Sequence, residues 1–334
     1  MPDTDIAMDL GTTNTLVHVR GLGIVLDEPS VVAVERSTQR VLAVGTEAKR
    51  ALVRRPEEVV AVRPASAESI ADRSVIDVIL SAFLERIRPR RRLRWSPDML
   101  ITVPAVMSER ERQMIISGAV AAGAGSVHML SGLIATAIGA GLLVHSPRAC
   151  MVVNIGGGLT EIGVIAPAGL IARHSIRIAG ESFNTLIASS IFHIHNLLIG
   201  DSTAELVKMR IGSARVERHP SRIEVNGRDA SSGQPRSVGI DSTTVSEALH
   251  EPLRAIVNAI RSTLNLTPPK IAAEIAEEGI ILSGGGACLR GMDRLISEET
   301  GLPVRTDPRP MMTVAKGAGI VLDDMRRYGE ALSA

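Results

Sequence analysis

The stretch Asp9-Leu10-Gly11-Thr12-Thr13-Asn14 lies between two apolar runs, at residues 6–8 and 16–19. About half the chain later, the pattern returns as Asn154-Ile155-Gly156-Gly157-Gly158-Leu159-Thr160-Glu161, between apolar runs at 151–153 and 162–165. A hairpin loop of this kind turns several backbone N–H groups toward one point, and glycine lets an anion approach because it has no Cβ. One such loop alone is more often a plain turn, but two of them predict a phosphate clamp.

A third glycine cluster, Gly284-Gly285-Gly286-Ala287, follows the apolar run 280–283 and precedes a helix-like stretch at 289–298. A strand that delivers glycines to the start of a helix suits an adenosine and its phosphates. The sequence contains neither GxxxxGK[ST] nor GxGxxG after a strand. P-loop and Rossmann nucleotide sites are therefore weak alternatives.

The composition excludes several classes of function. At 334 residues the chain is long enough for two domains, each with its own core. Lys+Arg 37 against Asp+Glu 36 argues against a nucleic-acid protein driven by bulk charge, so we expect no nucleic-acid partner. With Phe 3, Trp 1 and Tyr 1, stacking platforms for bases or sugars are scarce. Cys150 and Cys288 show no metal-ligand spacing and are expected to be buried and reduced.

The N-terminal segment begins directly on a strand-like run, without a basic n-region and an apolar h-region. No apolar run approaches the roughly 20 residues needed to span a bilayer. We therefore expect a cytoplasmic protein.

The apolar periodicity predicts a duplicated α/β layout with a cleft between the halves. The first half has strands within 6–35 and at 41–44 and 99–103, and helices at 46–52, 75–87, 109–122 (capped by Ser108) and 131–143. The second half restarts with strands within 151–178, followed by helices near 184–198, 203–211 and 245–264. Asn226-Gly227 predicts a hairpin turn between strands at 222–225 and around 237–240.

With these motifs the chain resembles the bacterial actin homologues of the MreB and Mbl type, in the actin, sugar-kinase and DnaK-type chaperone superfamily. The resemblance runs the whole length and is most specific at residues 23–33 and 284–304, which separate the chain from the sugar kinases. It implies an actin-like fold of two duplicated, ribonuclease H-like α/β domains around a nucleotide cleft, each with a smaller subdomain. We expect domain I at 1–143 plus 312–334 (subdomain IB about 32–72) and domain II at 144–311 (subdomain IIB about 181–245).

The resemblance also implies ATP and Mg²⁺ as ligands, with Asp9 orienting the metal through water. The implied phosphate contacts are Gly11, Thr12, Thr13, Asn14, Gly156, Gly157 and Gly158. The residues implied around the adenosine are Ala204, Glu205, Leu206, Val207, Lys208, Gly284, Gly285, Gly286 and Ala287, with Glu205 and Lys208 near the base and ribose. Without the resemblance, a Glu and a Lys three apart on a helix would be read as an ordinary solvated pair.

The chain departs from the family pattern at the positions that serve hydrolysis. At the position of Asn154, MreB-type proteins carry Asp, and at the position of Leu159 they carry Thr. In place of Ser131-Gly132-Leu133 they carry Glu-Glu-Pro. That Asp helps hold the metal and its water, and one of the glutamates positions the attacking water, a role typically worth about 10²- to 10⁴-fold in rate. We therefore expect weak or absent ATPase activity, with Glu161 as a weak candidate for a catalytic carboxylate. Compensation by Glu161 or Asp9 is the alternative.

A basic stretch at 86–95, Arg86-Ile87-Arg88-Pro89-Arg90-Arg91-Arg92-Leu93-Arg94-Trp95, falls where MreB proteins carry an apolar membrane-inserting loop. Arginines near an anionic leaflet contribute roughly 1 kcal/mol each, and Trp prefers the membrane interface. We predict membrane contact through Leu93, Arg94 and Trp95, at the inner face of the cytoplasmic membrane. A solvated basic loop, or one that binds an acidic partner or nucleic acid, is the alternative.

Together these features predict a cell shape-determining, actin-like cytoskeletal protein that binds ATP, forms membrane-associated filaments and helps organise cell-wall (peptidoglycan) synthesis. Its expected partners are further copies of itself or a paralogous actin-like subunit, the membrane surface and the cell-wall synthesis machinery. The alternative is a non-polymerising nucleotide-binding regulator or phosphotransferase of the same fold. That alternative needs a catalytic carboxylate, and the absence of glutamate at 131 and 132 favours the cytoskeletal protein.

Overall fold

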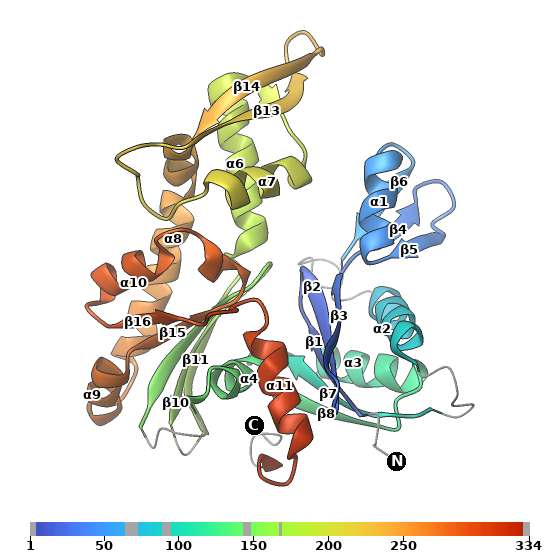
Figure 1. Ribbon diagram of the computed structural model, residues 1–334, viewed down its shortest axis with the longest axis vertical. Helices are drawn as coiled ribbons and strands as arrows, with labels where there is room; N and C mark the ends of the chain where they lie inside the picture. The colour runs from blue at the N-terminus through green and yellow to red at the C-terminus, as the bar shows by residue number, and fades with distance from the viewer. Residues whose placement is uncertain (1–4, 64–72, 89–94, 143–147, 167–168, 330–334) are drawn as a thin grey trace. The chain divides into compact units, whose positions relative to one another are not determined.

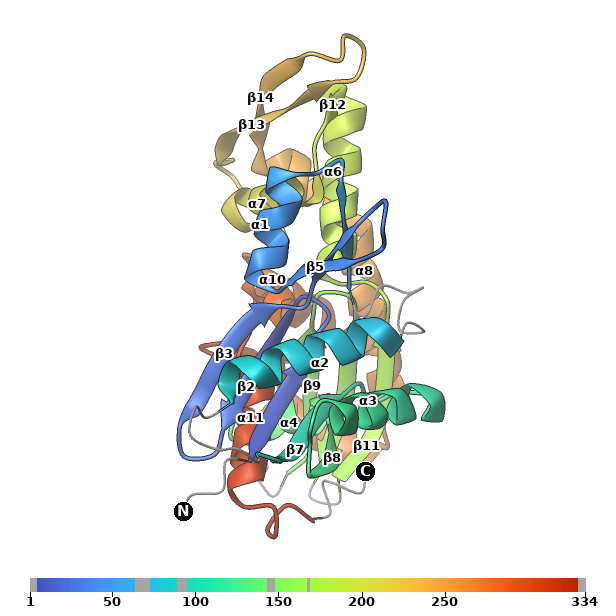
Figure 2. The same cartoon turned by 90° about the vertical axis from the view of Figure 1, so that its right-hand side faces the viewer.

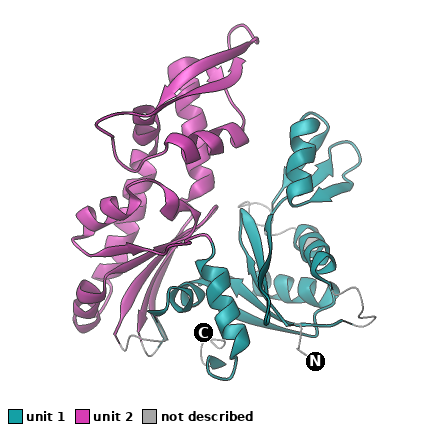
Figure 3. Cartoon of the chain, in the orientation of Figure 1, with its two compact units in different colours: residues 1–147, 167–170, 312–334 teal, residues 148–166, 171–311 magenta. Residues whose placement is uncertain are grey.

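The computed structural model describes residues 5–63, 73–88, 95–142, 148–166 and 169–329. The chain divides into two compact units, 1–147 with 167–170 and 312–334, and 148–166 with 171–311 (Figure 3). Each unit contains a five-stranded mixed sheet and a smaller three-stranded sheet (Figure 1).

The large sheet of the first unit has the strand order β3-β2-β1-β7-β8. β1 pairs antiparallel with β2 and parallel with β7. Side chains alternate between the two faces of a strand, so Ile6 and Met8 of β1 join one core while Ala7 joins another. The strands are β1 (Ile6–Leu10), β2 (Asn14–Val19), β3 (Gly23–Pro29), β7 (Asp98–Val103) and β8 (Ser126–Ser131).

Helices cover both faces of this sheet. α2 (Arg73–Ile87) and α3 (Glu109–Ala121) pack on each other and over the Ile6 and Met8 face (Figure 2). α4 (Gly132–Gly139) and α11 (Thr313–Asp323) cover the Ala7 face. Their backbones touch, because a Cβ added to Gly139 or Gly317 would collide with a main-chain oxygen of the other helix.

The predicted cap of α3 is confirmed. The Ser108 hydroxyl accepts the Glu111 N–H at 3.3 Å, and the Glu111 carboxylate accepts the Ser108 N–H at 2.7 Å. This reciprocal pair satisfies two N–H groups that have no partner within the helix.

The smaller sheet of the first unit, β5-β4-β6, packs against α1 (Thr46–Arg54). It consists of β4 (Val32–Glu35), β5 (Val41–Val44) and β6 (Val59–Val62). Its own small core contains Val31, Ala33, Ala48 and Val59. These elements fall within the range 32–72 expected for a subdomain, of which 64–72 lie outside the described residues.

The second unit repeats the strand order of the first, as β11-β10-β9-β15-β16. β9 pairs antiparallel with β10 and parallel with β15, just as β1 does with β2 and β7. The predicted duplicated α/β architecture is therefore confirmed. The strands are β9 (Cys150–Ile155), β10 (Thr160–Ala166), β11 (Gly169–Ile176), β15 (Ile280–Ser283) and β16 (Val304–Thr306).

One apolar core holds the helices of the second unit against β9, β10 and β15. The helices are α6 (Gly180–His195), α7 (Asp201–Ile211), α8 (Ser242–Asn265), α9 (Pro269–Glu278), the 3₁₀ turn η1 (Gly285–Cys288) and α10 (Met292–Thr300). The small sheet β12-β13-β14 adjoins α6 and α7 and consists of β12 (Leu197–Leu198), β13 (Arg222–Asp229) and β14 (Pro235–Asp241).

The hairpin turn predicted at Asn226-Gly227 is wrong. Both residues lie inside β13 and pair with β14, and the chain turns after Asp229 instead. The Asp229 carboxylate accepts the N–H groups of Ser231 and Ser232 at 3.0 and 2.9 Å, which is a favoured way to build a turn. Gly227 serves a close approach, since a Cβ there would lie 2.5 Å from the Leu198 oxygen of β12.

Two helices differ most from their predicted ranges. Ser131 is the last residue of β8, so the helix expected from 131 begins at Gly132, and it ends at Gly139. The helix expected near 184–198 begins at Gly180 and ends at His195, because Asn196 adopts the left-handed conformation at φ 52°.

The two cysteines differ in exposure. Cys150 is buried and Cys288 is exposed, so the expectation that both are buried is wrong for Cys288. Both are free thiols.

Candidate functional site

The first candidate site lies at the end of β1, where Asp9 is half-buried. Thr102 lies beside it in β7, and the Thr102 hydroxyl donates a 2.7 Å hydrogen bond to the Asp9 carboxylate. Burial raises the pKa of Asp9 to about 6, and the bond from Thr102 opposes that rise. Thr102 was not predicted as a site residue, although a polar residue near the end of an apolar strand is the signal that could have found it.

The loop from β1 to β2 is a tight turn held by its neighbours. A Cβ at Gly11 would lie 2.5 Å from the Asn14 carbonyl oxygen, so a side chain does not fit there. The Asn14 side chain donates to Asp27 at 2.7 Å, and the Thr13 carbonyl accepts the Ser30 N–H at 2.8 Å. Fixed geometry of this kind is what a loop needs to present backbone donors to an anion.

Ser131 ends β8 in the same sheet. Its side chain is buried, at 5% exposure, and its hydroxyl has no hydrogen-bond partner among the described residues. The serine side chain is shorter than a glutamate side chain and carries no charge. Ser131 therefore cannot supply the carboxylate that the family pattern has at this position.

The second candidate site lies at the ends of three neighbouring strands in the second unit. Asn154 of β9 is paired with Glu161 of β10 and with Ser283 of β15. Residues paired directly across neighbouring strands project from the same face of the sheet, so an amide, a carboxylate and a hydroxyl gather there. The Ser283 hydroxyl lies 3.5 Å from Asn154 Oδ1, and Glu161 is buried.

The loop 156–158 is fixed by the start of α6. The Gly180 N–H donates to the Gly156 carbonyl at 3.1 Å, and the Glu181 N–H donates to the Gly157 carbonyl at 2.7 Å. Because the C=O and N–H of a trans peptide point in opposite directions, the N–H groups of Gly157 and Gly158 point away from α6. These two N–H groups therefore lie on the side of the loop away from the helix. This support from α6 was missed because the helix was expected to start later.

The third glycine cluster packs directly on the end of β9. Gly284 has φ +83°, and a Cβ there would collide with the Ile155 carbonyl oxygen and lie 2.6 Å from Asn154 Oδ1. A Cβ at Gly286 would collide with the Ile155 side chain, whereas Gly285 faces open space. The second and third glycine clusters thus meet within one unit.

α7 brings Lys208 to the same place. Lys208 Nζ donates a 2.8 Å hydrogen bond to the carbonyl of Gly180, the first residue of α6. Burial lowers the pKa of Lys208, and the charges of Glu205 and Glu181 oppose that shift. In the predicted set 204–208, Ala204 and Val207 are fully buried in the core and Leu206 is exposed. Glu205 and Lys208 are the polar, half-buried members.

The predicted membrane segment is only partly described. Leu93 and Arg94 lie outside the described residues. Trp95 is partly buried and packs against the core of the first unit. Arg86 was expected in the same basic loop, but it belongs to α2, where it pairs with Glu28 at 2.8 Å and donates to the Val44 carbonyl at 2.9 Å.

Within the described ranges, no helix combines the length and the apolar character that crossing a membrane requires.

In the same residues, no three His, Cys, Asp or Glu side chains gather as ligands for a metal ion. Mg²⁺ keeps several of its waters in protein sites and needs as few as one or two carboxylates. The half-buried Asp9 carboxylate is compatible with that manner of binding.

Solved structures identify the class of fold. The chain matches the crystal structure of MreB5 of Spiroplasma citri bound to ADP with a TM-score of 0.91 and 29% identity, covering 98% of this chain and 99% of that one. It matches MamK in a double helical filament with a TM-score of 0.80 and 21% identity, covering 96% and 99% of the two chains, a likeness that shows the fold alone. The fold is therefore actin-like, as predicted.

Sequence comparisons identify the family. The family model described as MreB/Mbl protein matches residues 3–330. The chain is 42% identical over 333 residues to the cell shape-determining protein MreB of Escherichia coli (strain K12), covering 98% of this chain and 96% of that protein. It is 40% identical over 321 residues to the cell shape-determining protein Mbl of Bacillus subtilis (strain 168), covering 96% of each. The chain belongs to the MreB/Mbl family of actin-like, cell shape-determining proteins.

Proposed function

We propose that this protein determines cell shape as an ATP-binding, filament-forming actin homologue that acts at the inner face of the membrane and helps organise cell-wall synthesis. Its polymer partner would be a second copy of itself or a paralogous subunit. Family membership supports this function, as does the name cell shape-determining protein carried by relatives 42% and 40% identical to this chain. MreB5 of Spiroplasma citri has been solved with ADP and with AMPPNP, and MamK as a double helical filament.

One arrangement in the second unit carries the nucleotide-binding part of the proposal. The loop 156–158, the turn 284–287 and Lys208 all converge on the end of β9 and the start of α6. We assign phosphate contacts to this loop and to residues 11–14 of the first unit, and adenosine contacts to 204–208 and 284–287. Asp9 would hold a hydrated Mg²⁺, which neutralises phosphate charge when bound. The domain limits 1–143 with 312–334 and 144–311 belong to the same proposal.

A substitution in the glycine loop tests this assignment. Valine at Gly157 would place a branched side chain where the phosphates are expected, so Gly157→Val should abolish AMPPNP binding measured by calorimetry. Gly200→Val is the matched control, because a Cβ at Gly200 meets nothing within 4 Å. Sedimentation with and without ATP then tests polymerisation. Unchanged AMPPNP affinity in Gly157→Val would reject the loop assignment.

We also propose that ATP hydrolysis is weak, because neither Asn154 nor Ser131 supplies a carboxylate. Glu161, paired with Asn154 across β9 and β10, is the acid that remains in that part of the sheet. The double variant Asn154→Asp with Ser131→Glu should release phosphate faster than the parent, by up to the 10²- to 10⁴-fold typical of a general base. A parent that already hydrolyses as fast as an intact family member contradicts this proposal. The melting temperature of the variant serves as its folding control.

We also propose that Leu93, Arg94 and Trp95 contact the membrane, supported by the neighbouring arginines at 90–92; of these residues only Trp95 lies within the described ranges. The attraction of the arginines to lipid is electrostatic, so flotation should require anionic vesicles and weaken as the Debye length falls to about 10 Å near 0.1 M salt. A DNA retention assay run beside it distinguishes a nucleic-acid interaction, which is also salt-dependent. Flotation on neutral vesicles as strongly as on anionic ones, or DNA retention without flotation, would reject membrane contact by this segment.

A further inference from the structure

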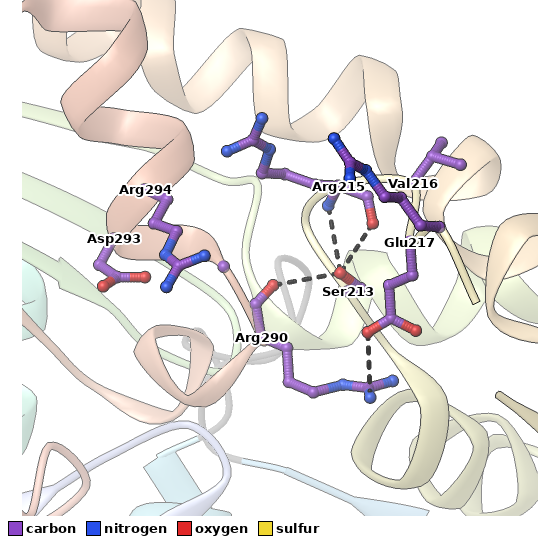
Figure 4. A pocket seen from close by; sticks show the side chains of 9 residues that line it. Ser213, Arg215, Val216, Glu217, Arg290, Asp293 and Arg294 are labelled. Atoms are coloured by element: carbon purple, nitrogen blue, oxygen red, sulfur yellow. Dashed lines mark hydrogen bonds and ion pairs between the residues drawn. The ribbon is translucent and has the colours of Figure 1, made fainter. Parts of the chain in front are cut away.

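A cavity of about 660 Å³ lies in the second unit, beside the residues proposed for the nucleotide but lined by none of them (Figure 4). Its lining comes from residues 213–218, which follow α7, and from 290–294, at the start of α10. Four of the lining residues are arginines and two are acids, so the lining carries an excess of positive charge. We call it the arginine pocket; its charged residues are Arg215, Arg218, Arg290, Arg294, Glu217 and Asp293.

Two of these guanidinium groups are held in place. Arg290 donates through Nε to the Gly212 carbonyl at 3.1 Å and forms an ion pair with Glu217 at 3.1 Å. Arg215 pairs with Glu298 at 2.5 Å. Positions fixed by such contacts lose less side-chain entropy when a ligand binds.

The other two guanidinium groups are available to a ligand. In the part of the chain that the structure describes, neither Arg218 nor Arg294 has a hydrogen-bond or ion-pair partner for its side chain. Figure 4 shows Arg294 projecting from α10 on the opposite side of the pocket from Arg215 and Glu217. Because Asp293 is, among the described residues, the one acid of the lining without an ion pair, these two arginines leave an excess of positive charge at this cavity.

The backbone adds to the positive potential. α10 begins at Met292, and its N-cap residue, Gly291, has no side chain that could accept a hydrogen bond from the first turn. The N-terminal N–H groups of a helix carry a partial positive charge and favour anions. Gly291 and Arg294 line the pocket, so this helix end adjoins the arginines, and Asp293 in the first turn offsets part of its positive charge.

We propose that the arginine pocket binds a phosphate-bearing small molecule at a site separate from the nucleotide. The guanidinium fork matches the oxygens of a phosphate and forms two parallel hydrogen bonds to it, which makes such contacts strong and directional. The cavity volume lies within the range of about 300–1,000 Å³ that is typical of small-molecule sites. An acidic peptide is the competing occupant, but arginines gathered around a single helix start suit a small polyanion better than an extended chain.

Calorimetric titration of tripolyphosphate into the full-length chain tests the proposal. AMPPNP at saturation keeps the probe away from the glycine loops. The parent should bind one equivalent of tripolyphosphate, and the double variant Arg218→Gln with Arg294→Gln should bind it at least about tenfold more weakly, because hydrogen bonds to charged groups are lost. Arg218→Lys with Arg294→Lys keeps the charge but removes the fork, and its affinity should lie between the two.

The matched control is Arg110→Gln with Arg173→Gln, which removes the same charge from exposed positions outside the pocket. It should bind tripolyphosphate as the parent does, and equal melting temperatures show that all variants fold. Absence of binding to the parent, or an equal loss in the control pair, overturns the proposal. So does arginine-dependent binding of hexaglutamate without binding of tripolyphosphate.

The phosphate group could come from a soluble molecule or from a lipid headgroup. Vesicles containing phosphatidic acid distinguish the two sources in a flotation assay. Flotation that the Arg218→Gln, Arg294→Gln pair weakens and the control pair retains in full would assign the phosphate to a lipid. Equal flotation of all variants, together with arginine-dependent binding of tripolyphosphate, would assign it to a soluble ligand.

Discussion

The ends of β1 and β9 hold the same place in two sheets with the same strand order, yet their chemistry differs. At the end of β1, a carboxylate accepts a 2.7 Å hydrogen bond from Thr102, and its pKa is raised to about 6. At the end of β9, the neutral Asn154 amide lies 3.5 Å from the Ser283 hydroxyl. The two sheets therefore keep the same strand order although one strand ends in a carboxylate and the other in a neutral amide. The strands are held by backbone pairing and apolar cores, and neither depends on that charge.

The largest effect is expected where the second site is most crowded. Gly284→Val should lower the free energy of unfolding by about 3 kcal/mol or more, because it adds backbone strain at positive φ to a steric collision. In the first site, the side chain of Gly11→Val would collide with one carbonyl oxygen, and the backbone φ of Gly11 is not positive. This variant should therefore lose less free energy of unfolding than Gly284→Val. Urea unfolding measures both, with Gly200→Val as control. Equal losses at Gly284 and Gly200 would contradict the crowding described for the second site.

Asp9→Asn gives the end of β1 the same neutral amide as the end of β9, and this change should stabilise the protein. The pKa of Asp9 is higher in the folded state than the 3.8 of an unperturbed aspartate, so ionising it opposes folding above pH 6, and this cost disappears as the pH falls toward 3.8. The gain should reach up to about 3 kcal/mol near pH 7.5 and be mostly absent near pH 4. Urea unfolding across this pH range measures it. A gain that does not depend on pH would show that the Asp9 charge is not its cause.

The reverse exchange, Asn154→Asp, should destabilise the second unit by about 2 kcal/mol near pH 7, because it adds a carboxylate at a partly buried position with one weak neighbouring donor. The loss should shrink at acidic pH, where the new carboxyl group is neutral. Unfolding curves of the single variant at two pH values provide the test. A variant as stable as the parent at both values would indicate that the second site already accommodates a carboxylate.

The smallest effects concern the hydroxyl partners. Thr102→Val removes a hydrogen bond to a charged group and should cost about 1.5 kcal/mol near pH 7. Ser283→Ala removes two long contacts, at 3.5 Å to Asn154 Oδ1 and at 3.4 Å to the Pro310 carbonyl, and should cost less than about 0.5 kcal/mol. Thr102→Val should also raise the pKa of Asp9 further, which NMR titration of the carboxyl carbon would detect. Similar costs for both variants would remove the distinction between the two sites.

Sequence reasoning succeeded where local pattern and tertiary structure agree. The apolar runs around both glycine loops, the Ser108 cap and the repeated strand-helix order all follow from periodicity and local hydrogen bonding. It failed where distant contacts override local preference. Asn226-Gly227 has the sequence of a turn, but β12 needs a glycine beside it and Asp229 supplies a stronger turn three residues later.

The candidate site was predictable in part. The glycines at 156–158 and 284–287 stand out in the sequence, but their mutual packing at Ile155 depends on a strand pairing between segments more than a hundred residues apart. Thr102, Gly180 and Ser283 were missed because each acts through a partner brought near by the sheet or by α6. The arginine pocket was not visible either, since its two segments are joined by a bridge between Ser213 and Arg290.

The close crossing of α4 and α11 has a consequence for the order in which the protein is made. α11 supplies Val314, Ala318, Val321 and Leu322 to a core whose other side is formed by β1, β7, β8 and α4. The ribosome makes the whole second unit before it reaches α11. At about 5–20 residues per second, the apolar face of the first sheet waits roughly 9–35 s for its last helix. The second unit, although begun later, is the first to be complete, so the nascent first unit is the part of the molecule that most needs protection from aggregation during synthesis.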